Sequence, residues 1–329
     1  MKSISIEALR FIFMVVIAVW HFGRINPFTH GYIAVDFYFL LSGYLLYGSY
    51  TKHKYDAMRY TEEKLKRFYP EYILVFIIAF LMKLHLLLRD NDAVTTFLNA
   101  ISEGLLIHSV GIFGGGVNQP AWYISVLIVG GGLLYAILYE YKKIAISIIF
   151  PLFALITYTY LLGINGSIEQ FAICGGVCQC LLRGMAGMAV GVMLAVFRER
   201  YSESLAKRTL VLNISCLMAV IIVCIVMFSV KHYDRFALLA FSALIVSCFV
   251  PTTFINRLFS SSIWAKLGGI TFEMLLVHSP VIWVLNNLTR SIKLSPYGIV
   301  GLAFVYIVIV LICSFALKHI GNRLNRIIK

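Results

Sequence analysis

Two consecutive apolar segments decide the fold class of this chain: Arg10-Phe-Ile-Phe-Met-Val-Val-Ile-Ala-Val-Trp20-His21 and, after a short loop, Gly31-Tyr-Ile-Ala-Val-Asp36-Phe-Tyr-Phe-Leu-Leu-Ser42-Gly43. Both are apolar enough to enter a membrane, yet they carry an arginine, a histidine and an aspartate. Eleven residues at roughly 100° each make about three helical turns. The side chains of Arg10 and His21 therefore project from one helix face, ~16 Å apart along the axis.

Charge and imidazole cost free energy within an apolar helix unless a polar cavity or a partner receives them, so Arg10 and His21 are candidate functional residues. The alternative is that Arg10 snorkels to the lipid headgroups and that the Trp20-His21 pair anchors the helix at the interface. Asp36 favours a functional role for these residues over the anchoring alternative, because it lies five residues into the next segment, at the expected depth of His21. A carboxylate there would hold the imidazole in one tautomer and stabilise its protonated form.

The composition excludes a soluble domain: 60% of the 329 residues are hydrophobic, 13% are charged and the mean hydropathy is +0.88. The first apolar stretch contains Glu7 and Arg10 and leads directly into a second span, which indicates a retained anchor and not a cleaved signal peptide. Of the seven cysteines, Cys174, Cys178 and Cys180 form the only cluster, and no histidine or carboxylate pattern accompanies them. We therefore expect no metal site.

We predict an all-α polytopic membrane protein with about ten transmembrane helices, organised as one domain over residues 1–329 without an appended soluble domain. Windows of about 20 apolar residues place the spans near 4–22, 31–50, 72–88, 121–140, 143–162, 176–197, 209–230, 236–255, 268–288 and 296–317. With the N-terminus inside, 19 of the 28 Lys and Arg residues fall in cytoplasmic segments and six in outer segments. This bias predicts that both termini are cytoplasmic. It also accounts for most of the net charge of +13, so we expect no nucleic-acid partner.

The cytoplasmic segment from Thr51 to Glu71 carries six lysines and arginines and ends in the helical pattern Lys64-Leu-Lys66-Arg67-Phe-Tyr-Pro70. We expect the proline to stop this helix at the mouth of the third span. The basic side chains either attract anionic lipids or cradle a phosphorylated cytoplasmic ligand.

The longest outer loop runs from Arg89 to Pro120, and its apolar pattern between Ala93 and Val110 predicts an amphipathic or re-entrant helix. The loop enters the fourth span through Asn118-Gln119-Pro120-Ala-Trp122-Tyr123. These side chains suit hydrogen bonding to a sugar and stacking on it, although a Trp-Tyr pair at a membrane edge is also typical of the aromatic belt.

Three further ionisable residues fall inside predicted spans. Arg183 lies mid-membrane in the sixth span, where a glycine every fourth residue favours close packing of a neighbouring helix. The ninth span carries Glu273 and His278, and the carboxylate is the candidate partner of this second imidazole. We treat these residues as one intramembrane polar set together with Arg10, His21 and Asp36.

In this order, the motifs resemble those of the acyltransferase-3 family of integral-membrane acyltransferases. Arg10 and His21 match its Arg-x10-His signature, and the segment from Gly31 to Leu46 is similar to its Gly-x-x-Gly-Val-Asp-Phe-Phe-Phe-x-x-Ser-Gly-Phe-Leu-Leu segment. Further matches are Lys64-x-x-Arg67-x-x-Pro70, Pro120-Ala-Trp122-Tyr123, Arg183-Gly, and Gly269-Ile-Thr271-Phe continuing to His278. The chain departs from the family pattern at Ala34, at Thr271-Phe272 and after Trp122, where the family has glycine, Ser-Tyr and, in many members, glutamate.

The resemblance implies transfer of an acyl group, usually acetyl, from acyl-coenzyme A in the cytoplasm to a hydroxyl of an extracytoplasmic surface glycan or lipid-linked sugar. It implies a multi-pass protein of a bacterial cytoplasmic (inner) membrane, in contact with the lipid bilayer, and it leaves the oligomeric state open. Together with the patterns above, it assigns catalytic roles to His21, Asp36 and His278, donor binding to Arg10, Lys64, Lys66, Arg67 and Arg183, and acceptor binding to Asn118, Gln119, Trp122 and Tyr123.

Two other functions fit the same polar set. A transporter or flippase would use the intramembrane His, Asp and Arg residues as a relay or a gate. Against it, the sequence shows no clear pair of interrupted helices in two corresponding halves. A catalytically silent scaffold or sensor is the third function. Consumption of a thioester by the purified protein distinguishes the enzyme from both.

The charge bias predicts that the segment from Thr51 to Glu71 is cytoplasmic and that the loop from Arg89 to Pro120 is outside. In intact cells, an impermeant thiol reagent should therefore label a cysteine-free protein that carries Asp92→Cys and spare one that carries Lys54→Cys. If the Lys54→Cys protein were labelled from outside, the predicted orientation would be wrong and the chain would be inserted the other way round.

Overall fold

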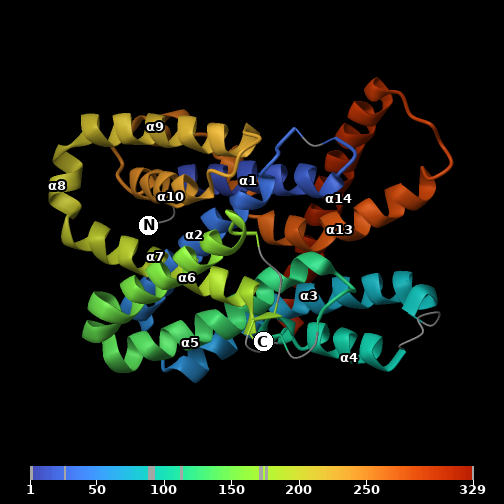
Figure 1. Cartoon of the computed structure of the whole chain (residues 1–329), viewed down its shortest axis with the longest axis horizontal. Coiled ribbons are helices and arrows are strands. Elements are labelled where there is room, and N and C mark those ends of the chain that lie inside the picture. Colours follow the sequence, from blue (N-terminus) through green and yellow to red (C-terminus); the bar gives the residue numbers. More distant parts are fainter. Residues whose placement is uncertain are drawn as a thin grey trace.

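The computed structural model describes residues 3–25, 27–87, 93–111, 114–169, 173–174 and 177–327. Most of these residues are helical (Figure 1), which confirms the predicted all-α class. Within the described ranges, one small ribbon departs from it, in which β1 (Ile173–Cys174) pairs antiparallel with β2 (Val177–Cys178).

Helices occupy the ranges in which the sequence predicts spans. They are α1 (Ile4–Phe22), α2 (Ala34–His53), α3 (Ala57–Leu87), α5 (Trp122–Ile144), α6 (Phe150–Asn165), α7 (Gln179–Arg200), α9 (Thr209–Phe228), α10 (Asp234–Cys248), α13 (Thr271–Leu288) and α14 (Pro296–Ile327). Shorter helical elements connect them: η1 (Gly31–Ile33), α4 (Ala93–Gly104), η2 (His108–Val110), η3 (Gln119–Ala121), η4 (Ala145–Ile149), α8 (Ser202–Lys207), α11 (Phe254–Leu258) and α12 (Ile263–Gly268).

Five stretches of the described chain are long and apolar enough to cross a membrane: Ile4–Phe22, Gln119–Ile164, Gln179–Arg200, Thr209–Phe228 and Pro296–Leu324. The second of them contains a kink at Tyr141, where the backbone leaves the helical region inside α5, before η4 leads into α6. These stretches support the membrane class, while the number of ten spans and the side of each terminus stay predictions.

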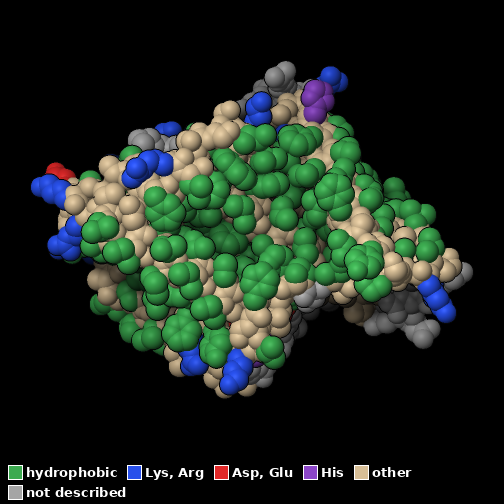
Figure 2. All heavy atoms as spheres, turned by 90° about the horizontal axis from the view of Figure 1, so that it is seen from above, with side chains coloured by type: hydrophobic (Ala, Val, Ile, Leu, Met, Phe, Trp, Pro, Cys, Tyr) green, Lys and Arg blue, Asp and Glu red, His purple; other side chains and the backbone are tan. Residues whose placement is uncertain are grey.

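The surface agrees with a lipid environment. Figure 2 shows hydrophobic side chains spread over one face of the molecule, with Lys and Arg side chains at its edges. Leu210 and Leu217 of α9 and Phe304 and Ile312 of α14 are each more than half exposed. An apolar belt of this extent is costly in water but suits hydrocarbon.

Local signals set both ends of α1. The Ser3 hydroxyl accepts a hydrogen bond from the Ile6 N–H and caps the N-terminus, while Glu7 places negative charge in the first turn. Gly23 ends the helix with φ at 72°, a conformation that glycine adopts without strain. The regular helix between these ends keeps Arg10 and His21 on the wall of one cavity.

α2 and α7 pack with their backbones in contact, as the glycine spacing of the sixth span predicts. A Cβ atom on Gly43 would lie 1.8 Å from the Met188 carbonyl oxygen, and one on Gly191 would lie 2.0 Å from the Leu40 carbonyl oxygen. Any larger residue at either position would push the helices apart. This close approach sets the register between α2 and α7.

The expectation that Pro70 ends the basic helix is wrong. α3 runs through Pro70 and joins the basic segment to the third predicted span. The proline removes one backbone donor, but tertiary packing on both sides of it holds the helix together. Before it, Phe68 lies against Phe272 with ring centroids 4.9 Å apart, and after it the buried Tyr72 donates its hydroxyl hydrogen to the Glu103 carbonyl.

The helix predicted in the outer loop is confirmed as α4, followed by the short η2. α4 is amphipathic: Val94 and Phe97 are exposed, while Ala100 and Glu103 are buried. The beginning of the loop, including Arg89 and Asp92, lies outside the described residues.

Candidate active site

A cavity of about 160 Å³ lies between α1, α2, α3, α5 and α13. Its wall brings together six residues that the sequence analysis selected: Arg10, His21, Lys64, Arg67, Trp122 and Tyr123. It also contains four polar side chains that the sequence analysis left without a role: Tyr38, Ser42, Tyr60 and Thr271. A mostly apolar cavity with a few convergent polar groups is typical of a small-molecule site.

The Arg10 guanidinium is held by two partners. Its Nη1 lies 2.6 Å from Glu7 Oε2, one turn earlier on α1, and its Nη2 donates to the Thr271 hydroxyl at 2.8 Å. The Tyr38 hydroxyl donates to the Arg10 backbone carbonyl. These contacts tie α1 to α2 and α13 while leaving further guanidinium N–H donors for a ligand.

His21 is oriented by its own helix. Its Nδ1 lies 2.9 Å from the Ile17 carbonyl oxygen, which can only accept, so Nδ1 carries a proton and, in the neutral ring, Nε2 has the lone pair. The ring of Trp20 lies edge-on at 4.8 Å between centroids. In its neutral form, the His21 ring therefore offers Nε2 as a proton acceptor on the cavity wall.

The expected pairing of Asp36 with His21 is wrong, because Arg183 takes both carboxylate oxygens of Asp36. Arg183 Nη2 lies 2.5 Å from Asp36 Oδ2 and Arg183 Nε lies 3.2 Å from Oδ1, with both side chains almost fully buried. The cause is the close approach of α2 and α7, which brings the Arg183 guanidinium to the side of α2 that faces α7, away from the cavity. The predicted contact of Arg183 with the donor is also not supported, because its side chain does not line the cavity.

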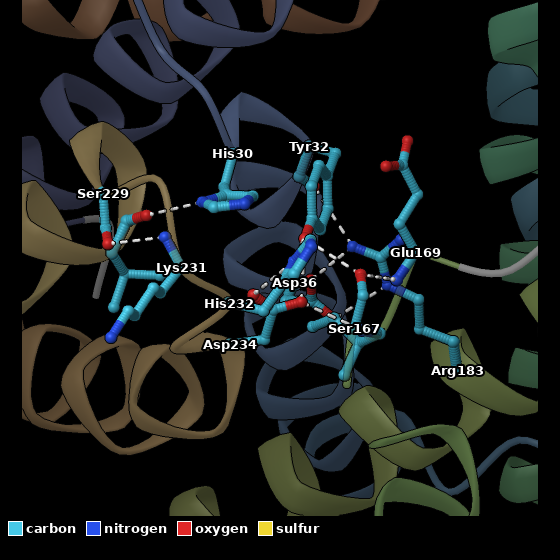
Figure 3. A network of polar contacts seen from close by, with 12 residues as sticks. His30, Tyr32, Asp36, Ser167, Glu169, Arg183, Ser229, Lys231, His232 and Asp234 are labelled. Carbon is cyan, nitrogen blue, oxygen red and sulfur yellow. Dashed lines mark hydrogen bonds and ion pairs between the residues drawn. The ribbon is translucent and has the colours of Figure 1, made fainter. Parts of the chain in front are cut away.

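Arg183 also connects this ion pair to a larger polar network, seen in Figure 3. Its Nη2 donates to the Tyr32 carbonyl at 3.1 Å, and the Tyr32 hydroxyl donates to Asp234 Oδ2 at 2.8 Å. The same oxygen of Asp234 accepts from the Ile168 N–H at 2.9 Å. The network thus links α2 and α7 to α10 and to the segment that follows α6.

His278 lies beside His21, with 5.1 Å between ring centroids, although it comes from α13. Its Nδ1 faces the Leu275 carbonyl at 2.8 Å, and among the described residues its buried Nε2 has no hydrogen-bond partner. The expected partnership with Glu273 is wrong, because Lys318 of α14 binds that carboxylate at 2.7 Å. The two residues lie five apart on a helix and so point in different directions.

Of the three basic residues of α3 that the sequence analysis selected, two face the cavity. Lys64 Nζ lies 5.4 Å from the centroid of the Tyr60 ring, and the Arg67 guanidinium lies 5.5 Å from that of Phe68. Burial, with a smaller contribution from Arg67, lowers the pKa of Lys64 to about 8. Lys66 points away from the cavity, is exposed, and pairs with Glu62 at 2.7 Å.

The four predicted acceptor residues divide into two pairs. Trp122 and Tyr123 line the cavity, and the Tyr123 hydroxyl lies 3.1 Å from that of Ser42. Asn118 is buried and donates from Nδ2 to the Leu276 carbonyl at 3.0 Å, which is a structural contact. Gln119 is exposed, and neither Asn118 nor Gln119 lines the cavity.

The sequence analysis missed Glu103, which positions the segment that leads into α5. Its buried carboxylate accepts hydrogen bonds from the backbone N–H groups of Gly116, Val117 and Asn118, at 2.6, 2.9 and 2.5 Å. The signal for this role is a carboxylate at the end of an amphipathic helix, followed by a glycine run whose N–H groups need acceptors.

These features define a membrane protein in which an imidazole and three cations face one cavity within a helical bundle. Residues 3–319 match the family model described as an acyltransferase domain. The chain therefore belongs to the acyltransferase-3 family, and it is a membrane acyltransferase. The comparisons with curated proteins and with solved structures returned no match.

Removing one partner of the Asp36–Arg183 pair leaves an uncompensated buried charge, so Asp36→Leu should lower the free energy of unfolding by about 3–5 kcal/mol. The double variant Asp36→Leu with Arg183→Met should recover part of this loss, because no buried charge remains. Thermal unfolding in detergent measures both. Lys66→Ala is the control: it breaks an exposed ion pair, expected to contribute roughly 0–1 kcal/mol. Equal effects of Asp36→Leu and Lys66→Ala would contradict the buried pair.

Proposed function

We propose that this protein transfers an acyl group, most simply acetyl, from cytoplasmic acyl-coenzyme A to a hydroxyl of a surface glycan or lipid-linked sugar outside a bacterial cytoplasmic membrane. The observation that carries the proposal is the single cavity lined by Arg10, Lys64, Arg67 and His21. Membership of an acyltransferase family supports the reaction class and argues against a transporter.

The cations bind the donor. Lys64 and Arg67 precede the third predicted span, on the side assigned to the cytoplasm by the charge bias, and Arg10 follows one turn after Glu7 on α1. Guanidinium groups bind phosphate oxygens through paired, charge-assisted hydrogen bonds. The pantetheine arm of the donor then follows α1 toward His21, a distance of ~16 Å by helical rise.

His21 acts as the general base. Its Nε2 takes the proton of the acceptor hydroxyl, whose oxygen forms a bond to the thioester carbonyl carbon. The carbon–sulfur bond breaks, and the proton passes from Nε2 to the leaving thiolate, which yields the ester and free coenzyme A. His278 does not line the cavity and acts as a positioning residue, packed against the His21 ring on its buried side.

An acyl-imidazole route has the same balance in two steps. Nε2 of His21 first takes the acyl group and releases coenzyme A, and the acceptor hydroxyl then removes the acyl group. A single turnover without acceptor distinguishes the two routes, because only the second one releases coenzyme A in stoichiometric amount before an acceptor is present.

The acceptor enters from the end of the cavity that α5 lines. Trp122 and Tyr123 offer aromatic faces to a sugar ring, and the Tyr123 and Ser42 hydroxyls offer hydrogen bonds. Asn118 and Gln119 contribute indirectly, by fixing the entry of the chain into α5.

His21→Ala tests the function. The variant should fold and bind donor as the wild type does, while acyl transfer falls by at least the ~10²–10⁴-fold that general acid–base catalysis contributes. Thioester consumption and acceptor acylation by purified protein are the measurements. His53→Ala is the matched control. His53 is an exposed residue at the end of α2, so this variant should retain full activity. Undiminished transfer by a folded His21→Ala protein would remove His21 from the chemistry.

Lys64 should make donor binding depend on pH. Its pKa of about 8 means that the side chain is charged below pH 8 and loses its proton as the pH rises through that value. Affinity for desulfo-coenzyme A, measured calorimetrically, should therefore fall between about pH 7 and pH 9. Lys64→Arg should abolish the fall in this range, because arginine stays protonated. The same pH profile in both proteins would exclude Lys64 as a phosphate ligand.

A further inference from the structure

A second cavity, of about 510 Å³, follows the first one along the same two helices. On α1 it begins at Ser3 and Ser5, before Arg10. On α2 its lining begins at Tyr44 and continues to Gly48 and Thr51, beyond the last residue that lines the first cavity. Leu45 lines both cavities and therefore lies where they meet.

The second cavity carries side chains of the types that bind phosphates and nucleobases. Arg198 of α7 is half-buried and makes one long hydrogen bond, at 3.4 Å, from Nη2 to the Phe249 carbonyl. Its other N–H donors are available to a phosphate. The rings of Tyr44 and Phe249 are stacked, with centroids 4.3 Å apart, and aromatic faces of this kind also stack on nucleobases.

One carboxylate also faces this cavity. Glu199 accepts a hydrogen bond from the Tyr47 hydroxyl at 2.7 Å, so this oxygen has a partner already. A second cation lies close by, since Lys142 Nζ is 5.7 Å from the centroid of the Tyr47 ring. Arg198 and Glu199 line the cavity while Lys142 does not, and a cation beside a carboxylate suits a ligand that has both phosphates and an amino-substituted base.

The two cavities follow one another in the order of the parts of the donor. From Ser3 to His21, α1 rises by ~27 Å, which passes the larger cavity and then the smaller one, whose lining on α1 begins at Arg10. A nucleotide is wide and a pantetheine arm is thin, and the cavity volumes of about 510 and 160 Å³ are ranked in the same way. Adenosine, pyrophosphate, pantetheine and thioester follow this sequence along coenzyme A.

Resting on the proposed function, we propose that the second cavity holds the phosphorylated adenosine end of the acyl-coenzyme A donor, with Arg198 as ligand of a phosphate. The pantetheine arm passes Leu45 into the first cavity and brings the thioester to His21. The shared chemistry is that of a phosphate ester, which an anionic lipid headgroup also offers.

The test compares two donors that differ only in the nucleotide. Purified protein in an uncharged detergent is given acyl-coenzyme A or S-acyl-pantetheine, and KM is measured for each. Arg198→Ala should raise KM for acyl-coenzyme A by about tenfold or more, the effect of losing one charge-assisted contact, and leave KM for S-acyl-pantetheine unchanged. Inhibition by adenosine 3′,5′-bisphosphate should weaken by the same factor. Arg200→Ala is the control, because Arg200 is exposed and does not line the cavity.

A second variant fills the cavity without removing a charge. No heavy atom lies within 4 Å of a Cβ placed on Gly48, so Gly48→Leu should fold and occupy cavity volume. It should raise KM for acyl-coenzyme A alone. If the two variants change KM by the same factor for acyl-coenzyme A and for S-acyl-pantetheine, the nucleotide does not bind in this cavity. The same conclusion follows if they change KM for neither donor.

Two further results have distinct meanings. An effect of Arg198→Ala that appears only in vesicles containing anionic lipid would assign the cavity to a lipid headgroup and overturn the inference. Failure of the wild type to consume either thioester would overturn the proposed function itself.

Discussion

The buried ion pair between Asp36 and Arg183 is the interaction on which the rest of the structure depends. Each charge is shielded from water, so each is stabilised by the other and, for the guanidinium, by the Tyr32 carbonyl. The pair holds α2 against α7 where Gly43 and Gly191 allow their backbones to touch. α2 forms one wall of both cavities, so the shape of the candidate active site follows from this contact.

The polar groups around the cavity illustrate how a helical bundle accommodates charge in an apolar medium. Glu7 compensates Arg10, and Lys318 compensates Glu273 on the other side of α13. The His21 ring is oriented by a backbone carbonyl of its own helix. Lys64 and Arg67, before the third predicted span, and the His21 imidazole further along α1 give the cavity a direction.

Those parts of the site that lie on one helix could be predicted from the sequence. Arg10 and His21 share a face of α1 because a helix repeats every 3.6 residues, and this repeat needs no tertiary information. The partners of Asp36 and Glu273 could not be predicted in this way. Each of them depends on how one helix is rotated and shifted against another, which the apolar pattern of a membrane span specifies weakly because most of its faces are hydrophobic.

The sequence by itself determined the all-helical membrane class, the order of the family motifs and the residue types available for chemistry. These follow from composition and from local periodicity, which the chain carries whether or not it is folded. The tertiary structure alone decided which polar groups meet. In the folded protein Asp36 pairs with Arg183, α3 continues through Pro70, and His278 lies beside His21. The physical reason is that a buried charge must pair with a partner that lies close to it in the packed bundle. Which partners lie close is decided by the helix contacts, and these exist only once the helices have packed.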